Sequence, residues 1–166
     1  MRLRSPAVLG LAVVLAAACK SHDPKAELEI TELETYWILD SPRGGTQYMA
    51  PAMRFRVKNR SPEPIRSIQA TANFRRVGEE ENWGSAWEQV TPASKPLEPG
   101  KDVLVVLRSD GRYTSPRNAE SMFAHELFKD ARGEVFLRVG SSGWVKMAEA
   151  PIERRVGSKT VEQLDR

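Results

Sequence analysis

Apolar and polar residues alternate with a period of two through much of the chain, as in β-strands with one buried face. The clearest alternation covers residues 28–31, 53–58, 68–75 and 135–139. Less regular strand patterns cover 36–39, 83–90 and 144–156. The unbroken apolar run 103–107 predicts a strand that is covered on both faces.

Turn residues separate these segments. Residues 59–64 read Asn-Arg-Ser-Pro-Glu-Pro, and proline fixes φ and removes a ladder donor. Pro99-Gly100 suits a type II turn, and Gly140 to Gly143 suits a four-residue hairpin loop. About seven short strands predict an all-β fold, an immunoglobulin-like β-sandwich, with an up-and-down barrel as the alternative.

One segment departs from the strand pattern. Ser115 and Pro116 are typical of a helix N-cap and first helical position. An apolar stripe with helical spacing follows, formed by Ala119, Met122, Phe123 and Leu127. We predict a short helix from Pro116 to Lys129, inserted between two strands and closing one end of the sandwich.

The N-terminus has the parts of a secretory signal. Arg2 and Arg4 give a positive start, and a small-and-apolar run from Ala7 to Ala18 precedes Cys19, the single cysteine. The run is shorter than the roughly 20 apolar residues that a helix needs to span a bilayer.

The residues before Cys19, Leu15-Ala16-Ala17-Ala18, resemble the lipobox of bacterial lipoproteins. This resemblance implies that the Cys19 thiol receives a diacylglyceryl group, that the chain is cut before Cys19, and that the new amino end is acylated. Lys20 in place of aspartate favours the outer membrane, by analogy with enterobacterial lipoproteins. An ordinary secretory signal cut after Ala18 is the alternative.

These features divide the chain into four parts. We expect a signal peptide at 1–18, an anchor and linker at 19–25, the β-sandwich at 26–156 and a polar tail at 157–166. Loss of Arg2 and Arg4 with the signal lowers the formal net charge from +3 to +1. A near-neutral mature chain has no general attraction to nucleic acid.

A second resemblance concerns the predicted sandwich. Val57 to Ser61, followed by a β-rich segment and by Pro96 to Gly100, is similar to FxLYD-type immunoglobulin-like domains of bacterial lipoproteins. The similarity covers roughly residues 50–108, and the aromatic-Leu-Tyr-Asp signature itself is absent. It implies a sandwich used for tethered binding or scaffolding.

Catalytic and metal-binding patterns are weak. His22 and His125 are the only histidines, and neither has the convergent partners that metal ligation or base catalysis needs. The segment from Gly140 to Gly143 lacks the order of a nucleophile elbow. Glu79 to Glu81 is typical of a solvated loop rather than a calcium site. We therefore expect no enzyme activity, no metal and no cofactor.

Two sets of residues are candidates for binding. Arg54, Arg56 and Lys58 form an outward cationic set that suits anionic polymers or lipid, and Arg75 is a candidate member from a neighbouring strand. Such charges also solubilise a strand and discourage edge pairing. The second set lies in two glycine-containing loops whose composition resembles binding loops, and consists of Arg43, Tyr48, Arg112 and Tyr113. Ordinary connectors with packed tyrosines are the alternative.

The sequence thus predicts a lipid-anchored protein of the cell envelope, held at the outer membrane and facing the periplasm. We expect a non-enzymatic binding or scaffolding module with an envelope protein as its partner. A carrier of lipids or other hydrophobes is the alternative, and it would need an apolar pocket near Met122, Phe123 and Phe128. An envelope hydrolase that uses an acid pair such as Asp110 and Glu126 is a third hypothesis.

Overall fold

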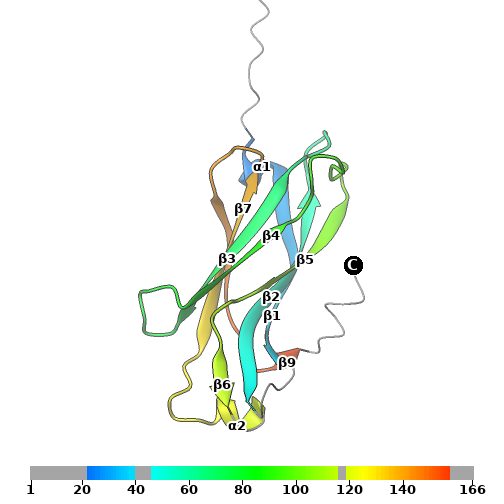
Figure 1. The fold of residues 1–166 in the computed structure, drawn as a ribbon. Helices are drawn as coiled ribbons and strands as arrows, with labels where there is room; N and C mark the ends of the chain where they lie inside the picture. Colours follow the sequence, from blue (N-terminus) through cyan, green and yellow to red (C-terminus); the bar gives the residue numbers. More distant parts are fainter. Residues whose placement is uncertain (1–21, 40–45, 116–118, 158–166) are drawn as a thin grey trace, which may run out of the picture.

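Two β-sheets pack face to face in the computed structural model, which describes residues 22–39, 46–115 and 119–157 (Figure 1). In chain order the elements are α1 (Pro24–Glu27), β1 (Leu28–Leu39), β2 (Gln47–Asn59), β3 (Ile68–Arg76), β4 (Gly84–Gln89), β5 (Asp102–Arg108), β6 (Tyr113–Ser115), α2 (Ala119–Phe123), β7 (Ala131–Val139), β8 (Val145–Pro151) and β9 (Val156–Gly157).

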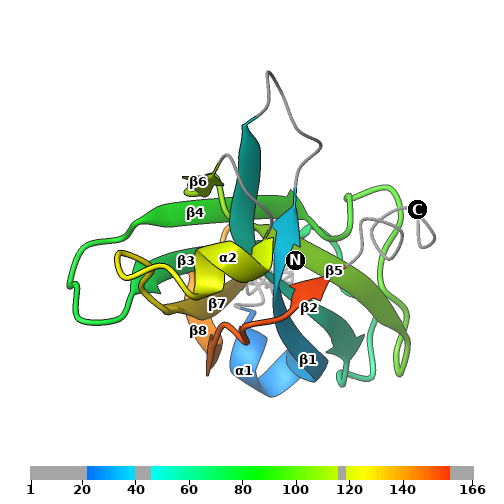
Figure 2. The ribbon, with the colours of Figure 1, turned by 90° about the horizontal axis from the view of Figure 1, so that it is seen from below.

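The first sheet has the strand order β5-β2-β1-β9, and β6 also pairs with β2. The second sheet has the order β4-β3-β7-β8. Seven long strands and two short ones form these sheets, so the predicted all-β immunoglobulin-like sandwich is confirmed and the barrel is excluded. Figure 2 shows the two layers with α2 crossing one open end.

The core follows from the period-two alternation. Side chains on the inner faces of the two sheets are fully buried, among them Phe55, Val57, Phe74, Val135 and Leu137. Burying an aliphatic or aromatic side chain of this size contributes roughly 1.5–3 kcal/mol relative to leaving it exposed. Packing of the two inner faces therefore stabilises the fold.

The run 103–107 forms β5, but the prediction that both faces are covered is wrong. Val105 and Leu107 are buried, whereas Leu104 and Val106 are only partly buried. β5 is the last strand of its sheet, and its outer residues lie beside the arginines of β2, with Arg54 opposite Val106 and Arg56 opposite Leu104. The hydrocarbon stems of arginine side chains can cover such apolar neighbours.

The predicted helix is also too long. Pro116 to Asn118 lie outside the described residues, and α2 ends at Phe123. Met122 is buried as expected, but Leu127 is 73% exposed. After α2 the chain continues in turns, and the Phe128 ring lies 5.2 Å from the Trp37 ring. No helix in the described part of the chain is long and apolar enough to cross a membrane.

β1 joins two sequence patterns into one strand through a bulge. The register with β2 shifts between Thr31 and Glu34, and Glu32 has a φ of 52°. A bulge adds residues on one strand and lets the alternation resume on the same faces. α1 precedes β1 and begins inside the predicted linker, with Asp23 as its N-cap.

The pattern at 144–156 forms two strands in different sheets. β8 ends at Pro151, and β9 pairs in parallel with β1. The Thr35 hydroxyl donates to the Pro151 carbonyl oxygen at 2.9 Å and accepts from the Glu153 N–H at 3.1 Å. This side chain therefore fixes the crossing between the two sheets.

The side chain of Asn59 is buried between two loops. Its side-chain amide donates to the carbonyl oxygens of Glu63 and Leu97, each at 2.8 Å, and its side-chain oxygen accepts from the Ser61 N–H. One fully buried side chain thus connects the β2–β3 and β4–β5 loops.

We predict that Asn59→Ala lowers the free energy of unfolding by roughly 2–4 kcal/mol, because buried backbone groups lose their partners. Ser61→Ala is the control, with an expected loss of at most about 1 kcal/mol because its hydroxyl bonds are exposed. Urea unfolding measures both, and equal losses would contradict the structural role of Asn59.

Candidate functional site

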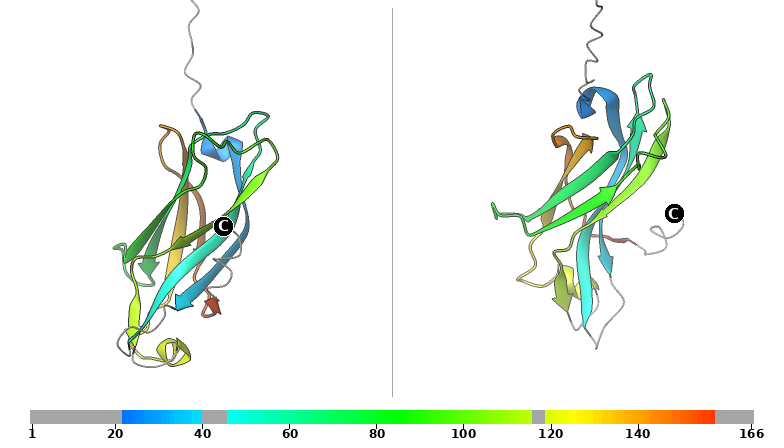
Figure 3. Two further views of the ribbon diagram at one scale, coloured as in Figure 1. Left: turned by 45° about the vertical axis from the view of Figure 1, so that its right-hand side comes forward. Right: turned by 45° about the horizontal axis from the view of Figure 1, so that its top comes forward.

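The end of the sandwich that carries β6, α2 and β9 lies opposite to α1, and we call it the distal end (Figures 1 and 3). β1 runs from α1 toward this end. At about 3.3 Å per residue, a strand of this length separates the two ends by roughly 35 Å.

Five aromatic rings close the distal end. Trp37 is fully buried, and its ring centroid lies 5.2 Å from Phe128, 5.9 Å from Tyr113, 6.2 Å from Phe123 and 6.3 Å from Trp83. Phe123 and Phe128 meet edge to face at 5.4 Å. Rings therefore fill the region where the carrier hypothesis expects an apolar pocket.

Tyr113 belongs to this cluster. Its ring lies 4.8 Å from Trp83, and its hydroxyl lies 3.2 Å from both the N–H and the carbonyl oxygen of Lys129. The hydroxyl accepts from that N–H and donates to that oxygen. The side chain packs down and ties β6 to the segment before β7.

The structure brings two other loop candidates together. The Arg112 guanidinium lies over the Tyr48 ring at 4.5 Å from its centroid. Arg112 is exposed and Tyr48 is half-buried, so the pair is accessible at the distal end. Arg43 and Cys19 lie outside the described residues.

The sequence suggested that Gly111 makes its loop adaptable, but in the structure this glycine allows two segments to pack closely. A Cβ at this position would lie 2.6 Å from the Trp83 carbonyl oxygen. A Cβ on Gly84 would lie 2.1 Å from the Ser109 hydroxyl and 2.6 Å from the Gly111 nitrogen. The β5–β6 loop thus crosses the start of β4 at a distance that only two glycines allow.

The cationic set on β2 faces outward as predicted, but carboxylates surround it. Arg56 contacts Asp102 at 2.6 Å and Glu32 at 3.0 Å, and Arg54 contacts Glu34 at 3.4 Å. The hydrogen bonds that Arg56 donates to Asp102 and Glu32 raise the pKa of Arg56. Lys58 is half-exposed and lies opposite Glu29. This surface carries mixed charge.

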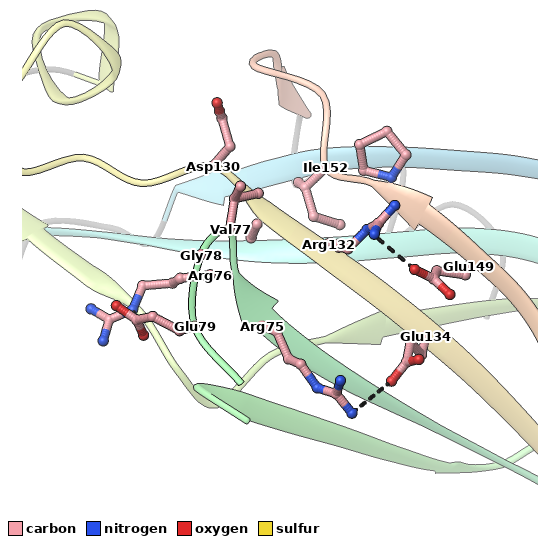
Figure 4. Close-up of a pocket in the computed structure, with 12 residues that line it drawn as sticks. Arg75, Arg76, Val77, Gly78, Glu79, Asp130, Arg132, Glu134, Glu149 and Ile152 are labelled. Carbon is pink, nitrogen blue, oxygen red and sulfur yellow. Dashed lines mark hydrogen bonds and ion pairs between the residues drawn. The ribbon is translucent and has the colours of Figure 1, made fainter. Parts of the chain in front are cut away.

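Arg75 lies in the other sheet, apart from the cationic set on β2. It contacts Glu134 at 3.2 Å and lines a cavity of about 600 Å³ beside the ends of β3 and β8 and the start of β7 (Figure 4). Arg76 and Arg132 line the same cavity. Sequence reasoning missed this group because it requires knowing that β3 pairs with β7.

The remaining chemical candidates have local contacts. His22 Nδ1 lies 2.8 Å from a Glu27 oxygen, and His125 Nδ1 accepts from the Leu127 N–H at 3.1 Å. Asp110 accepts from the Ser85 N–H, and Glu126 is exposed. Within the ranges the structure describes, no three His, Cys, Asp or Glu side chains are grouped to hold a metal ion.

The fold and these sites define an all-β sandwich protein with a closed distal end and a charged lateral cavity. No protein-family profile and no curated protein matches the chain. Among solved structures it is similar to a crystal structure of a Bordetella pertussis protein named as ApaA, with 15% identity and a TM-score of 0.41. The similarity covers 76% of this chain and 92% of that one.

Asp130, at the cavity, should titrate at abnormally low pH. Arg154 lies 2.7 and 2.9 Å from its two oxygens, and these hydrogen bonds lower the pKa of Asp130 despite partial burial. A carboxylate whose pKa is lowered in the folded state adds stability above its unfolded pKa of about 3.9. That stability is lost as the pH falls through the folded pKa.

We therefore predict that Arg154→Gln raises the pKa of Asp130 toward its ordinary value, as measured by NMR titration. The difference in unfolding free energy between parent and variant should be constant near neutral pH and shrink below about pH 4. The effect is small because both side chains are about half exposed. Identical titration of Asp130 in both proteins would contradict this prediction.

Proposed function

We propose that this protein is a lipid-anchored, non-enzymatic binding module of the bacterial cell envelope, held at the outer membrane and facing the periplasm. The support is the lipobox-like sequence before Cys19, combined with a sandwich that has α1 at one end and the pair of Tyr48 and Arg112 near β6 at the opposite end. Lipidation at Cys19 would hold α1 toward the membrane and present the distal end to a partner.

The contact between Arg112 and the Tyr48 ring is the observation that supports a binding surface at the distal end. Tyr48 at the start of β2 and Arg112 in the β5–β6 loop contribute one residue each, and the guanidinium lies 4.5 Å from the centroid of an accessible ring. Exposed arginine and tyrosine are enriched at the centres of protein–protein interfaces. An envelope protein is therefore the partner that this surface suits.

The N-terminal anchor is tested by metabolic labelling with a radioactive fatty acid. We expect label on the parent. For Cys19→Ala we expect loss of label and release from the membrane fraction, because this variant lacks the acyl chains that anchor the parent stably. Cys19→Ala processed by the ordinary signal peptidase serves as the soluble control. An unlabelled parent would refute lipidation.

The distal surface is tested by placing a photo-crosslinking amino acid at Arg112 in intact cells. We expect capture of a defined envelope protein there and no such capture from position 98, since Glu98 is exposed beside the loops at the α1 end. Tyr48→Ala should reduce capture because Arg112 loses its stacking partner. Equal capture from both positions would contradict a distal binding surface.

A further inference from the structure

The outer faces of the two sheets differ in composition. The β5-β2-β1-β9 sheet carries ion pairs on its outer face, such as those of Arg56 with Glu32 and Asp102. The outer face of the β4-β3-β7-β8 sheet also carries aromatic and uncharged polar side chains, beside the ion pairs at its distal part. We call this surface the tryptophan face, and its members are Gln69, Thr71, Trp87, Gln89, Phe136 and Trp144.

Two large aromatic side chains on the tryptophan face are exposed. Trp87 is 57% exposed and Trp144 is 39% exposed. Trp87 of β4 lies directly opposite Thr71 of β3, and Thr71 lies directly opposite Phe136 of β7. Neighbouring strands are about 4.8 Å apart, so the backbones of Trp87 and Phe136 are separated by roughly 10 Å, with a small side chain between them. Exposed apolar surface that polar groups border is typical of an interaction site.

The Trp144 ring is held over the same face. Arg138 lies two residues after Phe136 on β7, and its guanidinium lies 4.6 Å from the centroid of the Trp144 ring. Arg138 Nε also donates to Gln69 Oε1 at 2.6 Å. The ring is therefore positioned without being buried, which lowers the entropy cost of stacking a ligand on it.

Two side-chain amides beside the tryptophans are fixed by the fold. Gln69 and Gln89 are direct partners in the register of β3 with β4. Gln89 Nε2 donates to the carbonyl oxygens of Ile68 and Thr91, at 3.0 and 2.8 Å, so its Oε1 remains as an acceptor. Gln69 accepts from Arg138 through Oε1, so its Nε2 remains as a donor. The face thus offers a donor and an acceptor side by side, and a hydroxyl group can use both.

The charges that border the tryptophan face are already engaged. The Arg138 guanidinium lies against the Trp144 ring and is hydrogen-bonded to Gln69. Lys146 of β8 contacts Glu134 at 2.6 Å. Because interfaces pair complementary potentials, an uncharged ligand suits this face better than an ionic one.

We propose that the tryptophan face binds an extended chain of uncharged, β-linked pyranose sugars. The flat side of a pyranose ring presents C–H bonds, which stack on the electron-rich face of an indole. Each hydroxyl group of the sugar both donates and accepts, as the amides of Gln69 and Gln89 require. A β-linked chain with equatorial linkages forms a flat ribbon, so different sugars of one chain would contact Trp87 and Trp144.

A protein is the other class of ligand that exposed tryptophans suit. The centre of a protein–protein interface is its most apolar part, whereas here two fixed amides lie beside the aromatic rings. This arrangement matches a ring that carries many hydroxyl groups. The inference goes beyond the proposed partner-binding function, and it concerns the side of the sandwich rather than the pair of Tyr48 and Arg112 at the distal end.

The test is calorimetric titration of the full chain with cellohexaose, in micelles of a polyoxyethylene detergent that has no sugar headgroup. We expect saturable binding whose affinity is the same at low and high salt, because no ion pair is formed. Maltohexaose is the matched ligand control, since it contains the same sugar in a curved, α-linked chain. It should bind at least about tenfold more weakly.

Three variants test the residues of the face. Trp87→Ala and Trp144→Ala should each weaken binding of cellohexaose about tenfold or more, because each removes a stacking ring. Gln69→Glu keeps an oxygen for Arg138 but replaces the free donor by an acceptor, and should also weaken binding about tenfold. The thermal unfolding of all three variants without ligand should resemble that of the parent, because their side chains are not part of the core.

Leu127→Ala is the matched control for loss of an exposed apolar side chain. Leu127 is 73% exposed and lies after α2, outside the tryptophan face. This variant should bind cellohexaose with the affinity of the parent.

Absence of saturable binding of cellohexaose by the parent would overturn the proposal. Equal affinity for maltohexaose would do the same, as would a loss in Leu127→Ala that matches the loss in Trp87→Ala. Capture of one defined envelope protein by a photo-crosslinking amino acid at position 87 would assign the face to a protein instead. None of these results bears on the crosslinks at Arg112, so the two proposals fail separately.

Discussion

Burial of the Trp37 indole is the interaction on which the distal half of the structure depends. This one ring contacts others from the β3–β4 loop, β6, α2 and the segment before β7. Aromatic pairs in such tilted and edge-to-face arrangements contribute roughly 0.5–1.5 kcal/mol each beyond burial. The first sheet, the inserted helix and two segments that adjoin the second sheet thus meet at one side chain, which closes the sandwich where a two-layer fold would otherwise be open.

The period-two pattern predicted the all-β fold and favoured a two-layer sandwich over a barrel, because inner-face residues such as Phe55 and Phe74 must be apolar for the sheets to pack. The pattern did not predict side-chain exposure correctly where that exposure depends on the position of the strand in its sheet. The sequence of β5 predicts a strand buried on both sides, yet β5 lies at a sheet edge and Leu104 is only partly buried. The helical stripe likewise included Leu127, which a turn leaves outside the cluster.

Features that depend on which strands pair, and in which register, could not be predicted from the sequence. The bulge at Glu32 uses a positive φ without glycine, so no residue type marks it. The opposition of Arg75 and Arg132 depends on pairing between strands more than fifty residues apart. The outward placement of Arg54 and Arg56 was readable, but the carboxylates that neutralise them come from β1 and β5. The outward placement was therefore predicted correctly, but the paired carboxylates make this a surface of mixed charge rather than a cationic one.

The long pairing of β1 with β2 has a mechanical consequence. β1 follows α1 directly and runs to the distal end, and it is bonded to β2 along most of its length. A force applied between the N-terminus and the distal loops would act along β1 and load its hydrogen bonds in shear. Many bonds would then have to break together rather than one after another. The sandwich is therefore built to resist tension between the α1 end and the distal end.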